Sequence, residues 1–115
     1  MSLPKILIVE DKVKVREALC DFLHDVAEVI TAATPEEAKA LIQSNPDLKL
    51  ISVDGSLVQH GDGVEVVKFA VEQGFPGPIV AMSADDNTAM IQAGATHHVL
   101  KPRIASVLWE LIDGL

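Results

Sequence analysis

Five polar residues in this chain have the right types to handle a phosphoryl group together: Glu10, Asp11, Asp54, Ser83 and Lys101. Three neighbouring carboxylates repel one another unless a cation compensates, and Mg2+ is a hard cation that takes oxygen ligands. Asp54 could then attack phosphorus as a carboxylate nucleophile and form an acyl phosphate. Lys101 offers a point charge for phosphoryl oxygens, and the Ser83 hydroxyl can donate a hydrogen bond to one of them. This chemistry requires that all five side chains meet.

Each of these residues taken alone has an ordinary structural explanation. A Glu-Asp pair after a first strand often serves only to begin a helix, and a single Asp after a strand is common in turns and caps. The Lys101-Pro102 pair, taken alone, is typical of a surface turn. The functional interpretation therefore depends on the conjunction, in which an acidic pair, an Asp, a Ser and a Lys each follow a different predicted strand.

The elements that must position these residues alternate along the chain, strand then helix, five times. Short apolar runs of β type are separated by longer patterns with helical periodicity. The predicted strands cover residues 6–9, the vicinity of 29–30, 50–53, 79–82 and 98–100. The predicted helices cover about 15–23, 35–44, 64–72, 85–93 and 104–112, with a polar loop over 55–63.

The strands are apolar without strict alternation, which indicates that both faces of the sheet are buried, as in a parallel sheet. Right-handed crossovers between parallel strands give a doubly wound α/β fold, a flavodoxin-like three-layer sandwich with the predicted strand order 2-1-3-4-5. Ligands of such sheets bind beyond the carboxyl ends of the strands, where the strand order reverses. We therefore expect the five polar residues to converge at that rim, with Asp54 within reach of solvent.

Several local patterns make more detailed predictions. Thr34, followed by Pro-Glu-Glu, predicts the capped start of the second helix, and Gly94 predicts the end of the fourth. Phe22 falls on the apolar stripe of the first helix, Met90 is expected in the core, and Trp109 is expected to be partly buried on the last helix.

The composition bounds the class of protein. With 115 residues, residues 1–115 are expected to form a single domain, and residues 1–3 are compatible with an expression remnant. The formal net charge of −8 disfavours nucleic acid and anionic membranes as direct partners. No apolar run approaches a membrane span, and Cys20, the single cysteine, allows no intrachain disulfide. A cytoplasmic protein is the expectation.

Five segments of the sequence resemble the receiver domains of two-component response regulators: residues 6–11, Asp54 after an apolar run, 82–84, 94–95 and 101–102. The resemblance implies that Asp54 accepts the phosphoryl group, and that Glu10, Asp11, Asp54 and the backbone carbonyl of Ser56 hold Mg2+. It implies that Lys101 contacts the phosphate and that Ser83 is a switch hydroxyl.

The resemblance also implies partners for the chain. The phosphoryl donor would be a phosphohistidine on a sensor histidine kinase or a histidine phosphotransfer protein. Phosphorylation would switch a surface that an effector domain or downstream protein reads. Such a domain catalyses its own phosphorylation and dephosphorylation but is not a conventional turnover enzyme.

The sequence departs from the family's pattern at three places. Val58 stands where these domains usually carry a proline, and His98 stands where they carry a switch aromatic. His98 can be interpreted either as a switch residue or as a surface imidazole at the edge of the sheet. The stretch from Ser83 to Lys101 is shorter than usual, which predicts a shortened fourth helix.

Two rival functions remain open at this stage. One is a degenerate receiver that acts as a constitutive protein-binding module. The other is a flavin or nucleotide carrier on the same fold, because a fold alone does not decide function. The absence of a glycine-rich phosphate loop after residues 6–9, where Glu10-Asp11-Lys12 stands, disfavours the second.

Overall fold

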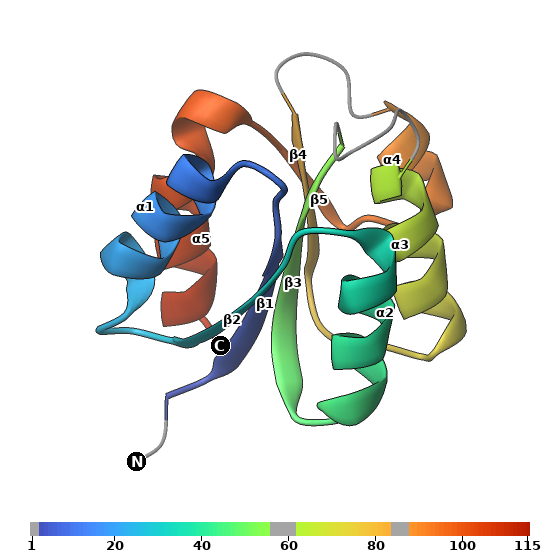
Figure 1. Ribbon diagram of the computed structural model, residues 1–115, viewed down its shortest axis with the longest axis horizontal. Coiled ribbons are helices and arrows are strands. Elements are labelled where there is room, and N and C mark those ends of the chain that lie inside the picture. The colour runs from blue at the N-terminus through green and yellow to red at the C-terminus, as the bar shows by residue number, and fades with distance from the viewer. Residues whose placement is uncertain (1–2, 56–61, 84–87) are drawn as a thin grey trace.

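A computed structural model describes residues 3–55, 62–83 and 88–115 of the chain (Figure 1). Strands and helices alternate in the described parts, as the apolar pattern predicts. The strands are β1 (Lys5–Val9), β2 (Glu28–Ala32), β3 (Leu48–Asp54), β4 (Ile79–Ser83) and β5 (His97–Leu100). The helices are α1 (Val13–Leu23), α2 (Pro35–Ser44), α3 (Asp62–Glu72), α4 (Thr88–Ala93), the 3-10 turn η1 (Lys101–Arg103) and α5 (Ile104–Asp113).

All strand pairs in the sheet are parallel, and the strand order is β2-β1-β3-β4-β5. The predicted order 2-1-3-4-5 is therefore confirmed. Val9 pairs with Val53 and Asp54 pairs with Met82, so the carboxyl ends of the central strands lie at one level. The residues that follow β1, β3, β4 and β5 are thereby brought to a single rim of the sheet.

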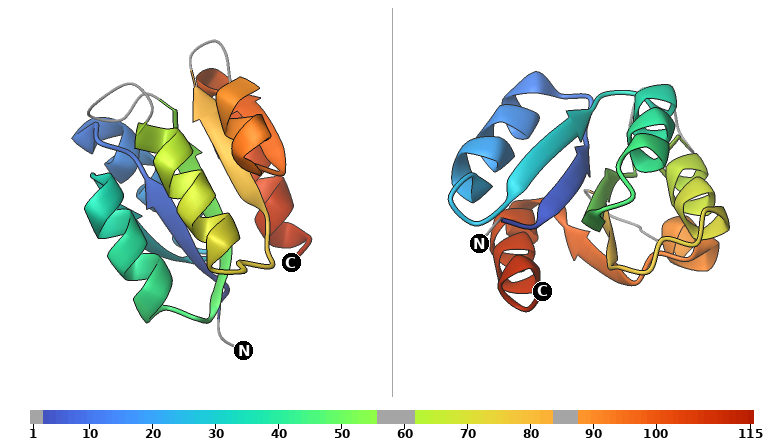
Figure 2. Two further views of the ribbon diagram at one scale, coloured as in Figure 1. Left: turned by 90° about the vertical axis from the view of Figure 1, so that its right-hand side faces the viewer. Right: turned by 90° about the horizontal axis from the view of Figure 1, so that it is seen from below.

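The helices cover both faces of the sheet and give the expected three layers. Helices α1 and α5 lie together on one face, and α2, α3 and α4 lie side by side on the other (Figures 1 and 2). Each face has its own apolar core. Within β1, Ile6 and Ile8 enter the core beneath α1 and α5, whereas Leu7 and Val9 enter the core beneath α2 and α3. This division explains why the strand is apolar at every position.

The predicted helix ends are present. The Glu37 backbone N–H donates to the Thr34 hydroxyl at 3.2 Å, which caps α2 as its sequence predicts. Gly94 follows α4 with a φ of +123°, and a Cβ at this position would approach Val71 Cγ2 to 2.6 Å. The described part of α4 is Thr88–Ala93; the predicted start of this helix lies outside the described residues, so the shortened fourth helix stays a prediction.

The structure corrects some details of the sequence prediction. Helix α3 begins at Asp62 rather than at 64, and β3 extends at both ends to Leu48–Asp54. Phe22 was expected on the buried stripe of α1 but is 48% exposed, and its ring lies 5.3 Å from that of Trp109 on α5. Phe22 lies at the margin of the contact between α1 and α5, so α5 covers only one side of its ring. Met90 is buried, as expected.

Within the described residues, none of the helices combines the length and apolarity needed to cross a lipid bilayer.

Candidate functional site

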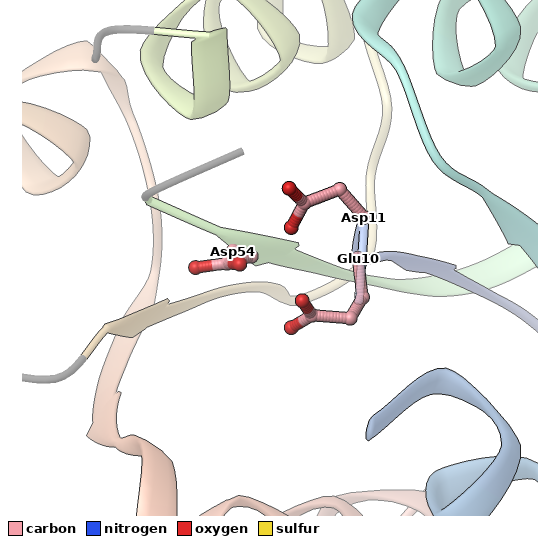
Figure 3. A group of neighbouring side chains, drawn as sticks. All are labelled: Glu10, Asp11 and Asp54. Atoms are coloured by element: carbon pink, nitrogen blue, oxygen red, sulfur yellow. The ribbon is translucent and has the colours of Figure 1, made fainter. Parts of the chain in front are cut away.

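Three carboxylates meet at the carboxyl rim of the sheet. Glu10 and Asp11 directly follow β1, and Asp54 is the last residue of β3. One oxygen from each carboxylate lies within 4.8 Å of the others, and Figure 3 shows the three side chains gathered at the ends of the two strands. The cluster forms because β1 and β3 are neighbours in the sheet, although Asp54 comes 43 positions after Asp11 in the sequence.

Lys101 brings a positive charge to the cluster from the end of β5, the edge strand of the sheet. Its Nζ lies 3.2 Å from Asp54 Oδ2, to which it donates a hydrogen bond, and 3.7 Å from Glu10 Oε2. Strand β5 ends at Leu100, and the 3-10 turn over Lys101–Arg103 with Pro102 near its start directs the lysine back over the rim. One ammonium group thus faces two buried carboxylates.

Burial and charge shift the proton equilibria of this cluster. Burial raises the pKa of Glu10 to about 7; the charge of Asp54 acts in the same direction, while the Lys12 N–H and Lys101 oppose it. Burial alone would lower the pKa of Lys101, but attraction to Asp54 and Glu10 outweighs that effect and the pKa is raised. Negative charge therefore exceeds positive charge at this rim when all the groups are ionised.

Backbone contacts hold the acidic pair in place. The Glu10 N–H donates to the Ala32 carbonyl at 2.9 Å, which continues the β1–β2 ladder by one residue. The Lys12 N–H donates to Glu10 Oε1 at 3.1 Å, and Arg16 Nη1 donates to the Glu10 carbonyl at 2.9 Å. The role of Arg16 was not predicted, because its side chain reaches Glu10 only through the turn that joins β1 to α1.

Two glycines allow close packing around the acceptor candidate. A Cβ on Gly63, in the first turn of α3, would lie 2.6 Å from the Asp54 carbonyl oxygen. A Cβ on Gly55 would lie 3.0 Å from Met90 Sδ on α4 and 3.5 Å from Ser83 Cβ. The backbone at 54–55 is thus enclosed by α3, α4 and β4. Gly63 follows Asp62 in the sequence, but its close approach to the Asp54 backbone could not be predicted from the sequence.

Ser83 ends β4, one residue beyond the partner of Asp54 in the neighbouring strand. Its side chain is 2% exposed, and its Oγ has no hydrogen-bond partner in the described parts of the chain. The Gly55 N–H donates to the Met82 carbonyl at 2.7 Å and ties the two strand ends together. A buried hydroxyl beside Asp54 is therefore available to donate to an added group.

The oxygens of the cluster suit a divalent cation. Glu10 Oε2 and Asp11 Oδ1 are buried and have no hydrogen-bond partner among residues 3–55, 62–83 and 88–115. Buried carboxylate oxygens without donors are costly unless a cation or proton compensates them. Closely spaced carboxylate oxygens are ligands of Mg2+, so the residues present fit that ion.

The accessibility expected of Asp54 was wrong for this structure: its side chain is 0% exposed. The Lys101 ammonium lies against its carboxylate, and the Lys101 and Asp11 side chains are 24% and 27% exposed. Asp11 and Lys101 are therefore more accessible than Asp54 and Glu10. Phosphorylation of Asp54 would require the groups that cover its carboxylate to move.

Two further predicted site residues lie elsewhere. Ser56 falls outside the described residues, so the expected carbonyl ligand has no structural account. His98 is exposed on β5, the edge strand of the sheet. That position agrees with the surface interpretation of His98, and its role as a switch stays a prediction.

Comparison with known proteins bears on the identity of this site. Residues 6–113 match the family profile described as the response regulator receiver domain. The chain belongs to the response regulator receiver family. That assignment covers nearly the whole chain and confirms the resemblance inferred from the sequence.

Two curated proteins share enough sequence to be relatives of this receiver. It is 35% identical over 113 residues to "Protein-glutamate methylesterase/protein-glutamine glutaminase 1" of Syntrophus aciditrophicus, covering 89% of this chain and 31% of that protein. It is 31% identical over 103 residues to "Transcriptional regulatory protein CiaR" of Streptococcus pneumoniae, covering 85% of this chain and 45% of that protein. The chain thus spans less than half the length of either relative.

Solved structures agree on the fold. A CheY-like receiver domain protein from Methanospirillum hungatei has a TM-score of 0.82 at 23% identity, covering 98% of this chain and 96% of that one. A receiver protein from Pseudoalteromonas atlantica also has a TM-score of 0.82, at 21% identity, with coverage of 96% and 98%. At these identities the likeness establishes the CheY-like fold alone.

Proposed function

We propose that this receiver accepts a phosphoryl group on Asp54 in a Mg2+-dependent reaction. The observation that carries the proposal is the meeting of Glu10, Asp11 and Asp54 within 4.8 Å, with Lys101 on Asp54 at 3.2 Å. Few structural roles require three carboxylates in one buried cluster, because their mutual repulsion opposes folding. A phosphorylation site requires such carboxylates, because they hold the cation that stabilises phosphoryl charge and one of them accepts the phosphoryl group.

The proposed step is a transfer from phosphohistidine to carboxylate. An oxygen of the ionised Asp54 attacks phosphorus, the phosphorus–nitrogen bond of the donor breaks, and the imidazole leaves with that electron pair and takes up a proton. The product is an acyl phosphate on Asp54. Positioning and electrostatic stabilisation are the main contributions that a protein makes to such transfers.

Glu10, Asp11 and Asp54 would hold Mg2+, with the Ser56 carbonyl as the further ligand that the family resemblance implies. When bound, the ion offsets carboxylate charge and the charge of phosphoryl oxygens. Lys101 neutralises part of the same charge in its absence. Glu10 Oε2 and Asp11 Oδ1, which accept no hydrogen bond within the described parts of the chain, support this assignment.

Phosphorylation adds about −1.5 to −2 charge and three acceptor oxygens at one point. Lys101 would exchange its carboxylate contact for the phosphoryl oxygens, and the Ser83 hydroxyl would donate to one of them. Because Ser83 and Leu100 are register partners on β4 and β5, both residues would carry the change toward the β5 edge of the sheet. The β4–β5 side is thus the proposed switching surface.

The proposed donor is a sensor histidine kinase or a histidine phosphotransfer protein. The proposed readers are an effector domain or a downstream protein; the two curated relatives, a methylesterase and a transcriptional regulator, illustrate different outputs. We place this chemistry in the cytoplasm, where the free thiol of Cys20 stays reduced.

The complete burial of Asp54 favours a second candidate, a degenerate receiver that binds a partner constitutively. In that function, the Lys101–Asp54 contact is a permanent structural pair, and no metal is needed. A titration with Mg2+ at millimolar concentrations, followed by amide shifts of residues 10, 11 and 54, separates the two candidates. The degenerate receiver would show no saturable shifts there.

The direct test is incubation with acetyl phosphate and Mg2+, read by intact-protein mass spectrometry. We expect one added phosphoryl group, lost when EDTA replaces Mg2+ and absent in Asp54→Asn. Asp62→Asn removes a carboxylate outside the metal cluster and should leave the adduct in place. An unmodified wild type, or an adduct that persists in Asp54→Asn, would refute phosphorylation at Asp54.

A further inference from the structure

The turn between β1 and α1 carries two of the three carboxylates of the site, and it consists of only three residues, Glu10, Asp11 and Lys12. In so short a turn the peptide groups set the direction of each side chain, because a planar peptide fixes two Cα atoms relative to each other. Within the described parts of the chain, Asp11 Oδ1 accepts no hydrogen bond that would hold it in place. The position of the acidic pair therefore depends on how the backbone of this turn is held.

The two ends of the turn are held by different means. At the strand end, the Glu10 N–H donates to the Ala32 carbonyl at 2.9 Å, just beyond the last register pair of β1 and β2. At the helix end, Lys12 occupies the N-cap position of α1. A lysine side chain has no acceptor, so it cannot cap the first N–H groups of the helix as Ser, Thr, Asp or Asn would. Another contact therefore joins α1 to the turn.

Arg16, one turn into α1, supplies that contact. Its Nη1 donates to the Glu10 carbonyl oxygen at 2.9 Å, and its backbone N–H donates to the Lys12 carbonyl at 3.0 Å. The Glu10 carbonyl belongs to the peptide that joins Glu10 to Asp11, so a bond to this oxygen orients both of the residues that carry carboxylates. The Nη1 contact is with a neutral carbonyl oxygen and not with a carboxylate, which favours a role in geometry over a role in neutralising charge.

We propose that Arg16 is a positioning residue for the Mg2+ site, which holds the Glu10–Asp11 peptide so that both carboxylates lie beside Asp54. The inference rests on the proposed function, because it concerns the same site. Contacts that orient metal ligands typically contribute about 10–100-fold to metal affinity. A purely electrostatic role makes the opposite prediction, because a positive charge beside an acidic cluster repels Mg2+ and its removal should tighten binding. The direction of the change in affinity separates the two roles.

The test is a Mg2+ titration of the whole chain, in which amide shifts of residues 10, 11 and 54 give the dissociation constant. Arg16→Met removes the charge and the donors from a partly exposed position, keeps a long side chain that favours helix, and should weaken Mg2+ binding roughly tenfold. Lys14→Met removes the same charge from an exposed position of the same helix. Its Mg2+ affinity should equal that of the wild type or exceed it by less than about twofold.

Two further measurements separate positioning from a general loss of stability. Thr96→Ala removes a hydroxyl that accepts from the Ile79 N–H at 2.9 Å, at the opposite end of the sheet from the carboxylates. This variant should unfold at lower urea concentration yet keep the wild-type Mg2+ affinity. In EDTA, the carbonyl carbon shift of Glu10 should change in Arg16→Met and stay in place in Lys14→Met, because only the first variant loses the Arg16 hydrogen bond. The second measurement tests the contact without any metal.

Three results would overturn the proposal. They are Mg2+ binding by Arg16→Met that equals or exceeds that of the wild type, equal weakening by Thr96→Ala and Arg16→Met, and a Glu10 carbonyl shift that Arg16→Met leaves in place. In each case saturable binding by the wild type would leave the proposed function standing. A wild type without saturable Mg2+ binding would refute the proposed function, and this inference with it.

Discussion

The two halves of the rim differ in how firmly they are held. On the β1–β3 side, Glu10 and Asp54 are fully buried, and helices α1 and α3 each have 11 residues. On the β4–β5 side, the edge strand β5 has 4 residues, three of them exposed. The carboxylates thus lie on the more buried β1–β3 half, which we call the firm half, while Lys101 reaches them from the more exposed β4–β5 half.

This difference suggests how the rim can respond to an added group. A dense interior resists small displacements, whereas a short edge strand with few buried contacts opens at lower free energy. The Lys101–Asp54 contact joins the two halves. A change at Asp54 should therefore move the β4–β5 half and leave the β1–β3 half in place.

The largest expected effect is at the most tightly packed point of the firm half. Gly63→Ala should lower the free energy of unfolding by about 3 kcal/mol, because the new Cβ would lie 2.6 Å from the Asp54 carbonyl oxygen. Urea unfolding measures the change. Gly74→Ala is the control, since a Cβ there meets nothing within 4 Å and the φ of +76° costs only about 1–2 kcal/mol. Equal losses in both variants would mean that α3 is not held tightly against β3.

The second prediction concerns the repulsion stored in the carboxylate cluster. The pKa of Glu10 is raised from 4.5 to about 7 in the folded chain, so the folded state binds more protons than the unfolded state between these values. Without divalent cations, stability from this group is present below pH 4.5 and lost as the pH rises through about 7.

Between pH 5 and pH 8 the loss should be roughly 2–3 kcal/mol. Glu10→Gln should remove this part of the pH dependence, as measured by urea unfolding in EDTA. Glu36→Gln, on the exposed start of α2, is the matched control and should keep the wild-type slope. An unchanged slope in Glu10→Gln would show that Glu10 is ionised throughout.

The third prediction tests the link between the halves. Lys101→Met should cost about 1–2 kcal/mol at pH 8, because two buried carboxylates lose their cation; the figure is reduced for the partial exposure of Lys101. Combining it with Asp54→Asn should restore most of the loss. Lys49→Met, on the exposed opposite end of β3, should change the unfolding free energy by less than about 0.5 kcal/mol. Additive effects of the Lys101 and Asp54 changes would argue that the two side chains are not coupled.

The smallest expected effect lies inside the firm half. Ser52 is fully buried in β3, and its hydroxyl has no hydrogen-bond partner within the described segments. Ser52→Ala should therefore stabilise the chain by about 1 kcal/mol, read from thermal or urea unfolding. Ser106→Ala removes an exposed hydroxyl that donates to the Arg103 carbonyl at 3.1 Å; because water can replace this bond, only a small change is expected of this comparison variant. Loss of stability in Ser52→Ala would indicate that its hydroxyl has a partner.

The sequence predicted the fold well where local pattern and global packing agree. Ile6–Val9 is apolar at every position because its two faces enter two cores, and Thr34 caps α2 as its type requires. The predicted burial of Phe22 was wrong because helical periodicity gives the direction of a side chain but not how far the neighbouring helix extends over it. Contacts with α5, such as that of Trp109, are decided only in three dimensions.

The candidate site shows the same limit. Residue types and strand ends predicted that Glu10, Asp11, Asp54 and Lys101 meet, because parallel strands place their carboxyl ends together. The spacing of residues in the sequence does not show which side chains will cover a site, so the burial of Asp54 was not predicted. The support of the Glu10 carbonyl by Arg16 was missed as well, because it depends on the shape of one turn.

Trp109 is the single tryptophan of the chain, and it lies on α5 against Phe22, on the opposite face of the sheet from α4. Its intrinsic emission is therefore an optical probe of the α1–α5 seam. Separation of α1 from α5 should change the emission spectrum strongly, whereas events confined to α4 should leave the spectrum unchanged. An unchanged Trp109 emission during a binding experiment would consequently show that the contact between α1 and α5 is intact. It would not show that no ligand has bound elsewhere.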